Sequence, residues 1–209
     1  MNRPDNLIHW IRSLDPDLRA AQLMMVSPDH EQHPEDAADW CIDSGWGGIF
    51  LQWRHLREME WLTAFMDRLR EREDDAPPMF VAVDEEGGLV SDLRMITGTA
   101  PSPAALGVID DSMITFQTAL AMGDKLRALG FNLNFAPCLD VNSESRNPVI
   151  GTRAFGATPQ IVVKHGLATL EGYARAGLVS CVKHFPGHGS TRLDSHVALP
   201  ILDAPLEVL

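Results

Sequence analysis

Short apolar runs alternate with longer segments of helical character along most of the chain. The runs that predict buried strands are residues 23–26, 47–51, 79–83, 131–136 and 177–182. The segments between them that predict helices, from their caps, breakers or apolar spacing, are residues 16–22, 34–43, 56–72, 112–129 and 159–176. Strands that alternate with helices in this way are typical of βαβ units, which pair in a parallel sheet.

Capping residues and glycines define several of the helix boundaries. Asp15 and Thr158 each precede a proline, the arrangement expected where a cap is followed by the first helical residue. Gly130 and Gly177 are expected to end the helices before them. Asp203 predicts one further helix start close to the last residue of the sequence.

The last predicted strand leads into a loop that is rich in titratable side chains. Pro186, Gly187 and Gly189 exclude a helix directly after the strand. Protonatable groups at the carboxyl end of a strand, followed by a loop that could close over a ligand, predict the active site of an α/β enzyme. The titratable side chains concerned are Lys183, His184, His188, Asp194 and His196.

Four motifs occur in a fixed order and resemble a known enzyme family. Residues 183–189 read Lys-His-Phe-Pro-Gly-His-Gly, and residues 194–196 read Asp-Ser-His. Three further stretches precede them, at residues 83–88, 135–141 and 147–156. Together they resemble the signature of glycoside hydrolase family 3, in particular its bacterial β-N-acetylhexosaminidase branch, over nearly the whole chain.

The resemblance implies an α/β fold, a TIM-type (β/α)8 barrel that forms the N-terminal part of the enzyme. Only about five strands are visible in the pattern, whereas a full barrel takes about 250 residues. We therefore expect residues 1–209 to be part of a single glycoside hydrolase barrel domain, truncated after about five strands.

The same resemblance assigns the catalytic roles. In family members with the Asp-Ser-His triplet, the histidine is the general acid/base and the aspartate orients it, which makes His196 the acid/base here and Asp194 its partner. An imidazole titrates near pH 6.5 when unperturbed, so it can give and retake a proton at neutral pH. The alternative for the pair is an ordinary ion pair within a loop.

Four residues match the family's sugar-binding positions. Asp84 would accept hydrogen bonds from sugar hydroxyls, and Arg153 would hold hydroxyls or an acyl group through its forked donors. Lys183 and His184 would add donors to the same pocket. The structural alternatives are a loop cap for Asp84, a surface ion pair for Arg153, and anchoring of the strand end for Lys183 and His184.

The sequence departs from the family pattern in two places: shortly after Asp84, and after the Asp-Ser-His triplet. Leu89 and Asp92 occupy two positions where the family usually has arginines, the second of which binds sugar, and Arg94 is a nearby candidate substitute. Glu85 and Glu86 are adjacent in a strand and point to opposite faces, so we assign neither of them to catalysis. The family's aspartate nucleophile follows the triplet at a distance and is expected beyond residue 209.

The leading interpretation is a retaining exo-β-N-acetylhexosaminidase that removes terminal β-linked N-acetylglucosamine in the turnover of cell-wall amino sugars. A β-glucosidase of the same family is a weaker alternative, because the Asp-Ser-His triplet is not expected there. A phosphorylase is another, since a histidine acid/base leaves room for phosphate as acceptor. A non-catalytic sugar-binding or degenerate protein is favoured by Leu89, Asp92 and the unassigned nucleophile.

Composition narrows the range of partners. A net charge of −12 argues against nucleic acid or an anionic membrane, and 45% hydrophobic residues are typical of a globular protein. No secretion signal or membrane span is visible, which predicts a cytoplasmic protein. Cys41, Cys138 and Cys181 are expected to be buried free thiols, and no Cys/His spacing indicates a metal site, so no metal or cofactor is predicted. The composition predicts no particular oligomeric state.

Overall fold

A computed structural model describes residues 7–72 and 76–202 of the chain. The contacts divide the chain into two compact units, residues 1–82 and 83–209. The helix start predicted at Asp203 lies outside the described residues. No helix among the described residues is long and apolar enough to cross a membrane.

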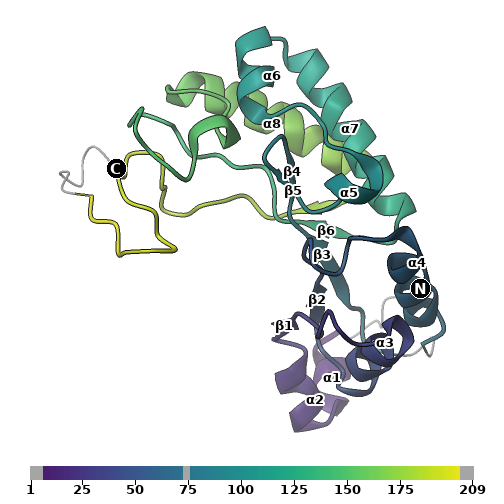
Figure 1. Cartoon of the computed structure of the whole chain (residues 1–209). Helices are drawn as coiled ribbons and strands as arrows, with labels where there is room; N and C mark the ends of the chain where they lie inside the picture. Colours follow the sequence, from purple (N-terminus) through teal and green to yellow (C-terminus); the bar gives the residue numbers. More distant parts are fainter. Residues whose placement is uncertain (1–6, 73–75, 203–209) are drawn as a thin grey trace. The chain divides into compact units, whose positions relative to one another are not determined.

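The first unit combines helices with parallel strands (Figure 1). β1 pairs with β2 so that Met25 faces Gly48, and β2 pairs with β3 so that Ile49 faces Val81. Apolar side chains of α3 and α4 are buried in this unit. Its elements are α1 (Leu7–Ser13), α2 (Pro16–Ala21), β1 (Met25–Val26), α3 (Pro34–Asp43), β2 (Gly48–Phe50), α4 (Met59–Arg70) and most of β3 (Phe80–Val83).

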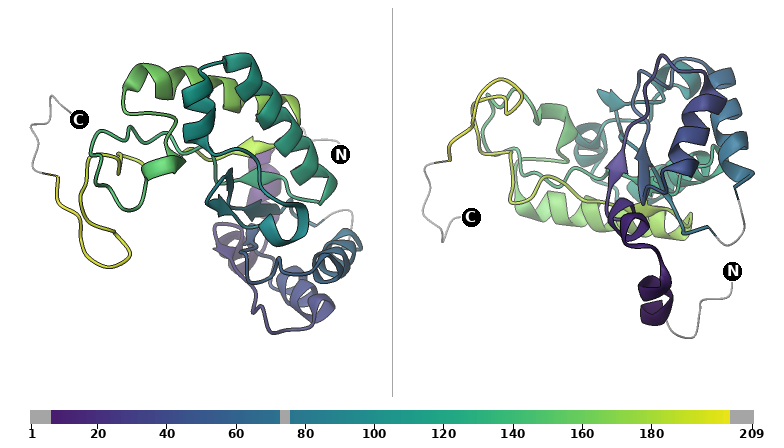
Figure 2. Two further views of the ribbon diagram at one scale, coloured as in Figure 1. Left: turned by 45° about the horizontal axis from the view of Figure 1, so that its top comes forward. Right: turned by 90° about the horizontal axis from the view of Figure 1, so that it is seen from below.

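The second unit begins at the last residue of β3. The amide of Phe135 donates to the carbonyl of Val83 at 3.0 Å, and β6 pairs in parallel with β7 through Leu133 and Val179. The long helices α7 and α8 lie side by side in both figures (Figure 2). The elements are β4 (Glu85–Gly87), β5 (Val90–Ser91), α5 (Arg94–Thr97), α6 (Pro103–Ile109), α7 (Ser112–Ala128), β6 (Leu133–Asn134), the 3-10 turn η1 (Gly151–Arg153), α8 (Pro159–Arg175) and β7 (Val179–Ser180).

A glycine-dependent turn follows the end of β3. Gly87 and Gly88 have φ values of 91° and 61°, which favour glycine, and they join β4 to β5 in a short antiparallel pair. A Cβ atom on Gly87 would lie 2.5 Å from the carbonyl oxygen of Pro101. The turn can therefore form only with glycine here, and it holds residues 84–86 in place at the end of β3.

Five parallel strands and five of the helices occur where the sequence predicts them, although β1, β6 and β7 are shorter than expected. The structure adds α1, α5, α6 and the β4–β5 hairpin, which the sequence analysis did not predict. One thiol expectation is wrong: Cys41 and Cys138 are buried, but Cys181 is exposed. Cys181 lies directly after β7, where the flanking Val179 and Val182 are also half exposed.

Candidate active site

The parallel pairing of β6 with β7 continues past both strands and determines which residues meet. Cys138 and Lys183 form a further parallel bridge, in which the amide of Leu139 donates to the carbonyl of Lys183 at 2.7 Å. The amide of Lys183 donates to the carbonyl of Pro137 at 3.3 Å. This register places Asp140 beside His184, although 44 positions separate them in the sequence.

Two cations converge on the carboxylate of Glu86. Arg153 donates to both of its oxygens, from Nε at 2.9 Å and from Nη2 at 2.8 Å. Lys183 Nζ lies 2.5 Å from Oε1 of the same carboxylate and also contacts Oδ1 of Asp84. The side chain of Glu86 is 0% exposed, whereas that of Asp84 is 30% exposed. Asp84 thus offers a solvent-accessible acceptor above a buried ion-pair network.

The network decides the ionisation of Glu86. Burial alone would raise the pKa of this carboxyl, but the hydrogen bonds from Arg153 and the charge of Lys183 outweigh burial and lower its pKa. The same pairing raises the pKa of Arg153 against its own burial. Glu86 is therefore a fixed anion that orients two cations, and it has no proton to give at neutral pH.

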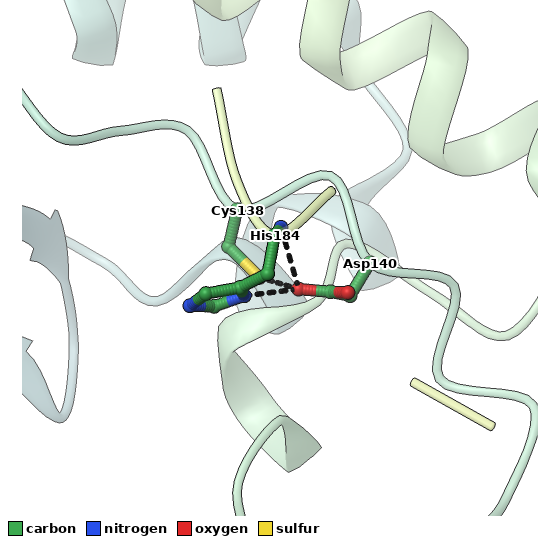
Figure 3. Close-up of side chains that lie close together, drawn as sticks. All are labelled: Cys138, Asp140 and His184. Atoms are coloured by element: carbon green, nitrogen blue, oxygen red, sulfur yellow. Dashed lines mark hydrogen bonds and ion pairs between the residues drawn. The ribbon is translucent and has the colours of Figure 1, made fainter. Parts of the chain in front are cut away.

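Asp140 is the second buried anion of the site and accepts four hydrogen bonds. Its Oδ2 accepts from the His184 amide at 3.2 Å, from His184 Nδ1 at 2.6 Å and from Cys138 Sγ at 3.2 Å (Figure 3). Its Oδ1 accepts from the amide of His188 at 2.5 Å. Burial opposes ionisation, yet the bonds from His184 and His188 lower the pKa of Asp140 to about 2. The carboxylate therefore ties the loop after β7 to the end of β6.

The hydrogen bonds of His184 select one tautomer of its ring. Nη2 of Arg153 lies 3.2 Å from His184 Nε2, and a guanidinium can only donate, so Nε2 accepts. The ring hydrogen is then on Nδ1, from which it is donated to Asp140. We call the six residues that share this network the charged cluster: Asp84, Glu86, Asp140, Arg153, Lys183 and His184.

Asp194 and His196, which we call the dyad, form a local pair on the last described loop. Oδ1 of Asp194 accepts from the backbone amide of His196 at 2.8 Å and from His196 Nδ1 at 2.7 Å. The bond from the backbone amide has the larger effect and the bond from Nδ1 the next, and both lower the pKa of Asp194. The carboxylate is therefore ionised at neutral pH. Since Nδ1 is bound to Asp194, Nε2 is the atom of His196 that is able to exchange a proton with a ligand. The His196 side chain is 78% exposed.

Comparison with known families identifies the family of the chain. The model of the glycosyl hydrolase family 3 N terminal domain matches residues 16–209. The chain belongs to glycoside hydrolase family 3. The resemblance drawn from the four motifs is thereby confirmed, and the family 3 structures that match the chain confirm the α/β fold class as part of a TIM-type barrel.

Similar proteins of family 3 have been described from several bacteria. The beta-hexosaminidase A of Pseudoalteromonas piscicida is 40% identical over 147 residues, which are 68% of this chain and 24% of that protein. The beta-hexosaminidase of Idiomarina loihiensis is 38% identical over 165 residues, 77% of this chain and 48% of that protein. A family 3 beta-N-acetylglucosaminidase structure from Paenibacillus sp. str. FPU-7 matches with a TM-score of 0.84 and 35% identity, covering 94% of this chain and 38% of that one. The chain thus spans between about a quarter and a half of the relatives it matches.

The described contacts divide the residues that the family 3 motifs indicated into two groups. Asp84, Arg153, Lys183 and His184 come together in the charged cluster, with Asp84 and Lys183 at the same end of their strands. The expectation that His196 joins them is not met by the described contacts, in which His196 bonds to Asp194. In Figure 1 the loop that carries the dyad is the yellow segment near the end of the described chain.

Of the residues at the two unusual positions, Asp92 bonds to Asp84, whereas Leu89 is exposed. Oδ2 of Asp92 accepts from the backbone amide of Asp84 at 3.3 Å, and the amide of Asp92 donates to the Asp84 carbonyl at 3.1 Å. Leu89 is 71% exposed. Arg94, the candidate substitute, donates to the backbone carbonyls of Ser91 and Leu89. Its guanidinium is therefore used within its own loop.

Sequence reasoning missed two residues that organise the site. Glu86 is two positions after Asp84, and residues two apart in an extended segment point to the same side. This spacing was the available signal that Glu86 belongs to the cluster. Its neighbour Glu85 does point elsewhere, as expected, and pairs with Lys125 at 3.2 Å. The role of Asp140 depends on the register between residues 138 and 183, for which the sequence contains no local signal.

Proposed function

We propose that the chain supplies the sugar-binding face and the acid/base pair of a retaining β-N-acetylhexosaminidase, which hydrolyses terminal β-linked N-acetylglucosamine. The observation that carries this proposal is the charged cluster. It combines a solvent-accessible carboxylate at Asp84 with donors on Arg153 and Lys183, beside the imidazole of His184, and all three of these latter side chains are held by buried anions. Acceptors and donors fixed side by side suit vicinal hydroxyls and an acetamido group.

In the proposed reaction, His196 protonates the glycosidic oxygen as the bond to the leaving group breaks. It later takes a proton from the water that attacks the glycosyl-enzyme. Asp194 holds the ring hydrogen on Nδ1 and stabilises the imidazolium form. The nucleophile is expected beyond residue 209. Glu86 and Asp140 are poor candidates, because every oxygen of both carboxylates already accepts a hydrogen bond from within the protein.

The assignment extends to a role in the turnover of cell-wall amino sugars and to a cytoplasmic location. The names of the similar proteins support the sugar class. The three unpaired cysteines support a reducing compartment. No organic cofactor is needed by this chemistry, since His196 and a carboxylate nucleophile supply the proton transfer and the covalent step.

Product analysis on the natural full-length protein tests the function directly. The protein is given nitrophenyl β-N-acetylglucosaminide or nitrophenyl β-glucoside, each with and without phosphate. We expect nitrophenol and free N-acetylglucosamine from the first substrate, with little turnover of the second. Preference for the glucoside would support the β-glucosidase alternative, a sugar phosphate would support a phosphorylase, and sugar binding without product would support the non-catalytic alternative.

A further inference from the structure

Three side chains with metal-binding atoms converge at the base of the charged cluster. Cys138 Sγ, one carboxylate oxygen of Asp140 and one ring nitrogen of His184 all lie within 4.8 Å of one another. Cys138 and Asp140 are buried, with exposed fractions of 0% and 2%, while His184 is partly exposed. Figure 3 shows the side chains of Cys138 and His184 on one side and that of Asp140 on the other, with one carboxylate oxygen of Asp140 facing both.

This donor set is one that proteins use for zinc. Thiolate, imidazole and carboxylate are all zinc ligands, with bond lengths of about 2.3 Å to sulfur and about 2.0–2.2 Å to nitrogen and oxygen. In a tetrahedron with those bond lengths, neighbouring ligand atoms are about 3.4–3.6 Å apart. The present separations are 3.2 Å from Sγ to Oδ2 and 2.6 Å from Nδ1 to Oδ2. Displacements of about 1 Å or less would therefore open the site to the ion.

We propose that Cys138, Asp140 and His184 bind a zinc ion, with a fourth position left for water, and that zinc bound there competes with the sugar. No local spacing in the sequence indicates such a site, because the ligands come from two segments that meet through the parallel bridge between residues 138 and 183. Cys138 and Asp140 are two positions apart in an extended segment, so their side chains point to the same side.

Zinc would take the place of two hydrogen atoms in the metal-free network. In that network the Cys138 thiol and His184 Nδ1–H both donate to Oδ2 of Asp140. On zinc binding the thiol proton passes to solvent, while the imidazole loses its Nδ1 proton and takes one up on Nε2. The net release is one proton for each zinc ion, and the charges of thiolate and carboxylate balance the ion.

The change of tautomer connects the metal to the sugar-binding face. With hydrogen on Nε2, His184 can no longer accept from Nη2 of Arg153, and two donors would face each other across the present 3.2 Å. Arg153 also binds Glu86 and is one of the proposed sugar contacts. The competition with sugar therefore rests on the proposed function, whereas the metal site itself does not.

Cobalt(II) is the spectroscopic probe for the metal site, because a Co(II)–thiolate bond gives a near-ultraviolet charge-transfer band. The natural full-length protein is reduced, freed of metal and titrated with Co(II) and then with Zn(II) by calorimetry in buffers of different ionisation enthalpy. We expect one Co(II) ion to bind per chain and to produce the band. Zinc should then displace the cobalt. The calorimetry should show that one proton is released for each ion bound to the metal-free protein. Cys138→Ser should remove the band and weaken zinc binding by at least about 10–100-fold, the cost of removing even an outer partner of a metal ligand.

Two other cysteines provide matched controls. Cys181→Ser changes an exposed thiol and Cys41→Ser a buried one, both outside the cluster, so both should keep the band and the affinity. Circular dichroism and thermal unfolding show whether each variant is folded. If folded Cys138→Ser keeps the band, or the wild type binds no Co(II) or Zn(II), the metal site is wrong.

Sugar binding is measured on the same samples. Zinc should weaken N-acetylglucosamine binding to the wild type and leave binding to Cys138→Ser unchanged. If zinc and sugar bind together without interference, the competition is overturned and the metal site stands. If the metal-free protein binds no amino sugar but shows the cobalt band, the proposed function fails independently of the metal site.

Discussion

The charged cluster and the dyad differ in how firmly the fold holds them. In the cluster the side chains of Glu86 and Asp140 are both 0% exposed, and each carboxylate accepts from several partners. In the dyad His196 is 78% exposed, and its described bonds run to Asp194, two positions away. The groups assigned to binding are thus fixed before a sugar arrives, whereas the side chain assigned to proton transfer is largely exposed and is bonded to a neighbour in its own loop.

This contrast implies that binding and chemistry can be separated by substitution. A change in the cluster should alter stability and sugar affinity together, because the same ion pairs serve both. A change in the dyad should alter turnover and leave stability nearly unchanged, because the side chain of His196 packs against little.

The largest effect is expected from His196→Ala in the natural full-length enzyme. Turnover of a substrate with a poor leaving group should fall by about 10²–10⁴-fold, the usual contribution of a general acid/base. An activated aryl glycoside needs little protonation, so its glycosylation rate should fall far less. Asp194→Asn should act in the same direction but more mildly. Equal losses on both substrates, measured by steady-state and single-turnover kinetics, would contradict the acid role of His196.

Glu86→Gln should destabilise the protein strongly without touching the dyad. The substitution leaves Arg153 and Lys183 beside a neutral partner in a buried site, and breaking such a pair costs about 3–5 kcal/mol. Urea unfolding measures the loss. The matched control is Asp67→Asn, which removes an exposed ion pair with Arg70 and should cost at most about 1 kcal/mol. Similar losses for the two variants would show that the cluster is not held by Glu86.

The pH dependence of stability should differ between wild type and Glu86→Gln. The folded pKa of Glu86 lies below its unfolded value of about 4.3, so its ionised form stabilises the fold at higher pH. That contribution is complete above the unfolded pKa and is lost as the pH falls through the folded pKa. The free-energy gap between the two proteins should therefore be constant from pH 7 to about pH 5 and shrink below about pH 4. A gap that widens in acid would reverse the assigned sign.

The smallest effect is expected from Arg94→Ala. Because its guanidinium donates to backbone carbonyls of its own loop, its loss should change N-acetylglucosamine affinity by no more than about twofold. Calorimetric titration of the sugar checks this. A loss of affinity as large as that of Arg153→Ala would mean that Arg94 does replace the arginine missing at the Asp92 position.

The sequence predicted the parts of the site that a single motif contains. Asp84, Lys183 and His184 follow predicted strands directly, and the carboxyl ends of parallel strands meet at one edge of a sheet. Arg153 was found through its motif and not through any strand, since it lies in the 3-10 turn η1. The resemblance also predicted that Asp194 and His196 pair, and their two hydrogen bonds join residues only two positions apart.

Features that depend on pairing between distant segments could not be predicted. The contact between Asp140 and His184 requires the register of residue 138 against residue 183, and one step of slippage would direct Asp140 to the other face. α6 is a different case, because Ser102 caps it and Pro103 opens it, the same signal that correctly predicted the start of α8 at Pro159. The helix α6 was therefore missed although its sequence signal was present.

The central claim is that the charged cluster binds the sugar and the dyad does not. The most direct test is the equilibrium affinity for N-acetylglucosamine of three proteins: the wild type, Asp84→Ala and His196→Ala. We predict that Asp84→Ala loses at least about tenfold in affinity, equivalent to about 1.4 kcal/mol, while His196→Ala stays within about twofold of the wild type. The opposite pattern, with His196→Ala losing the sugar and Asp84→Ala retaining it, would contradict the account.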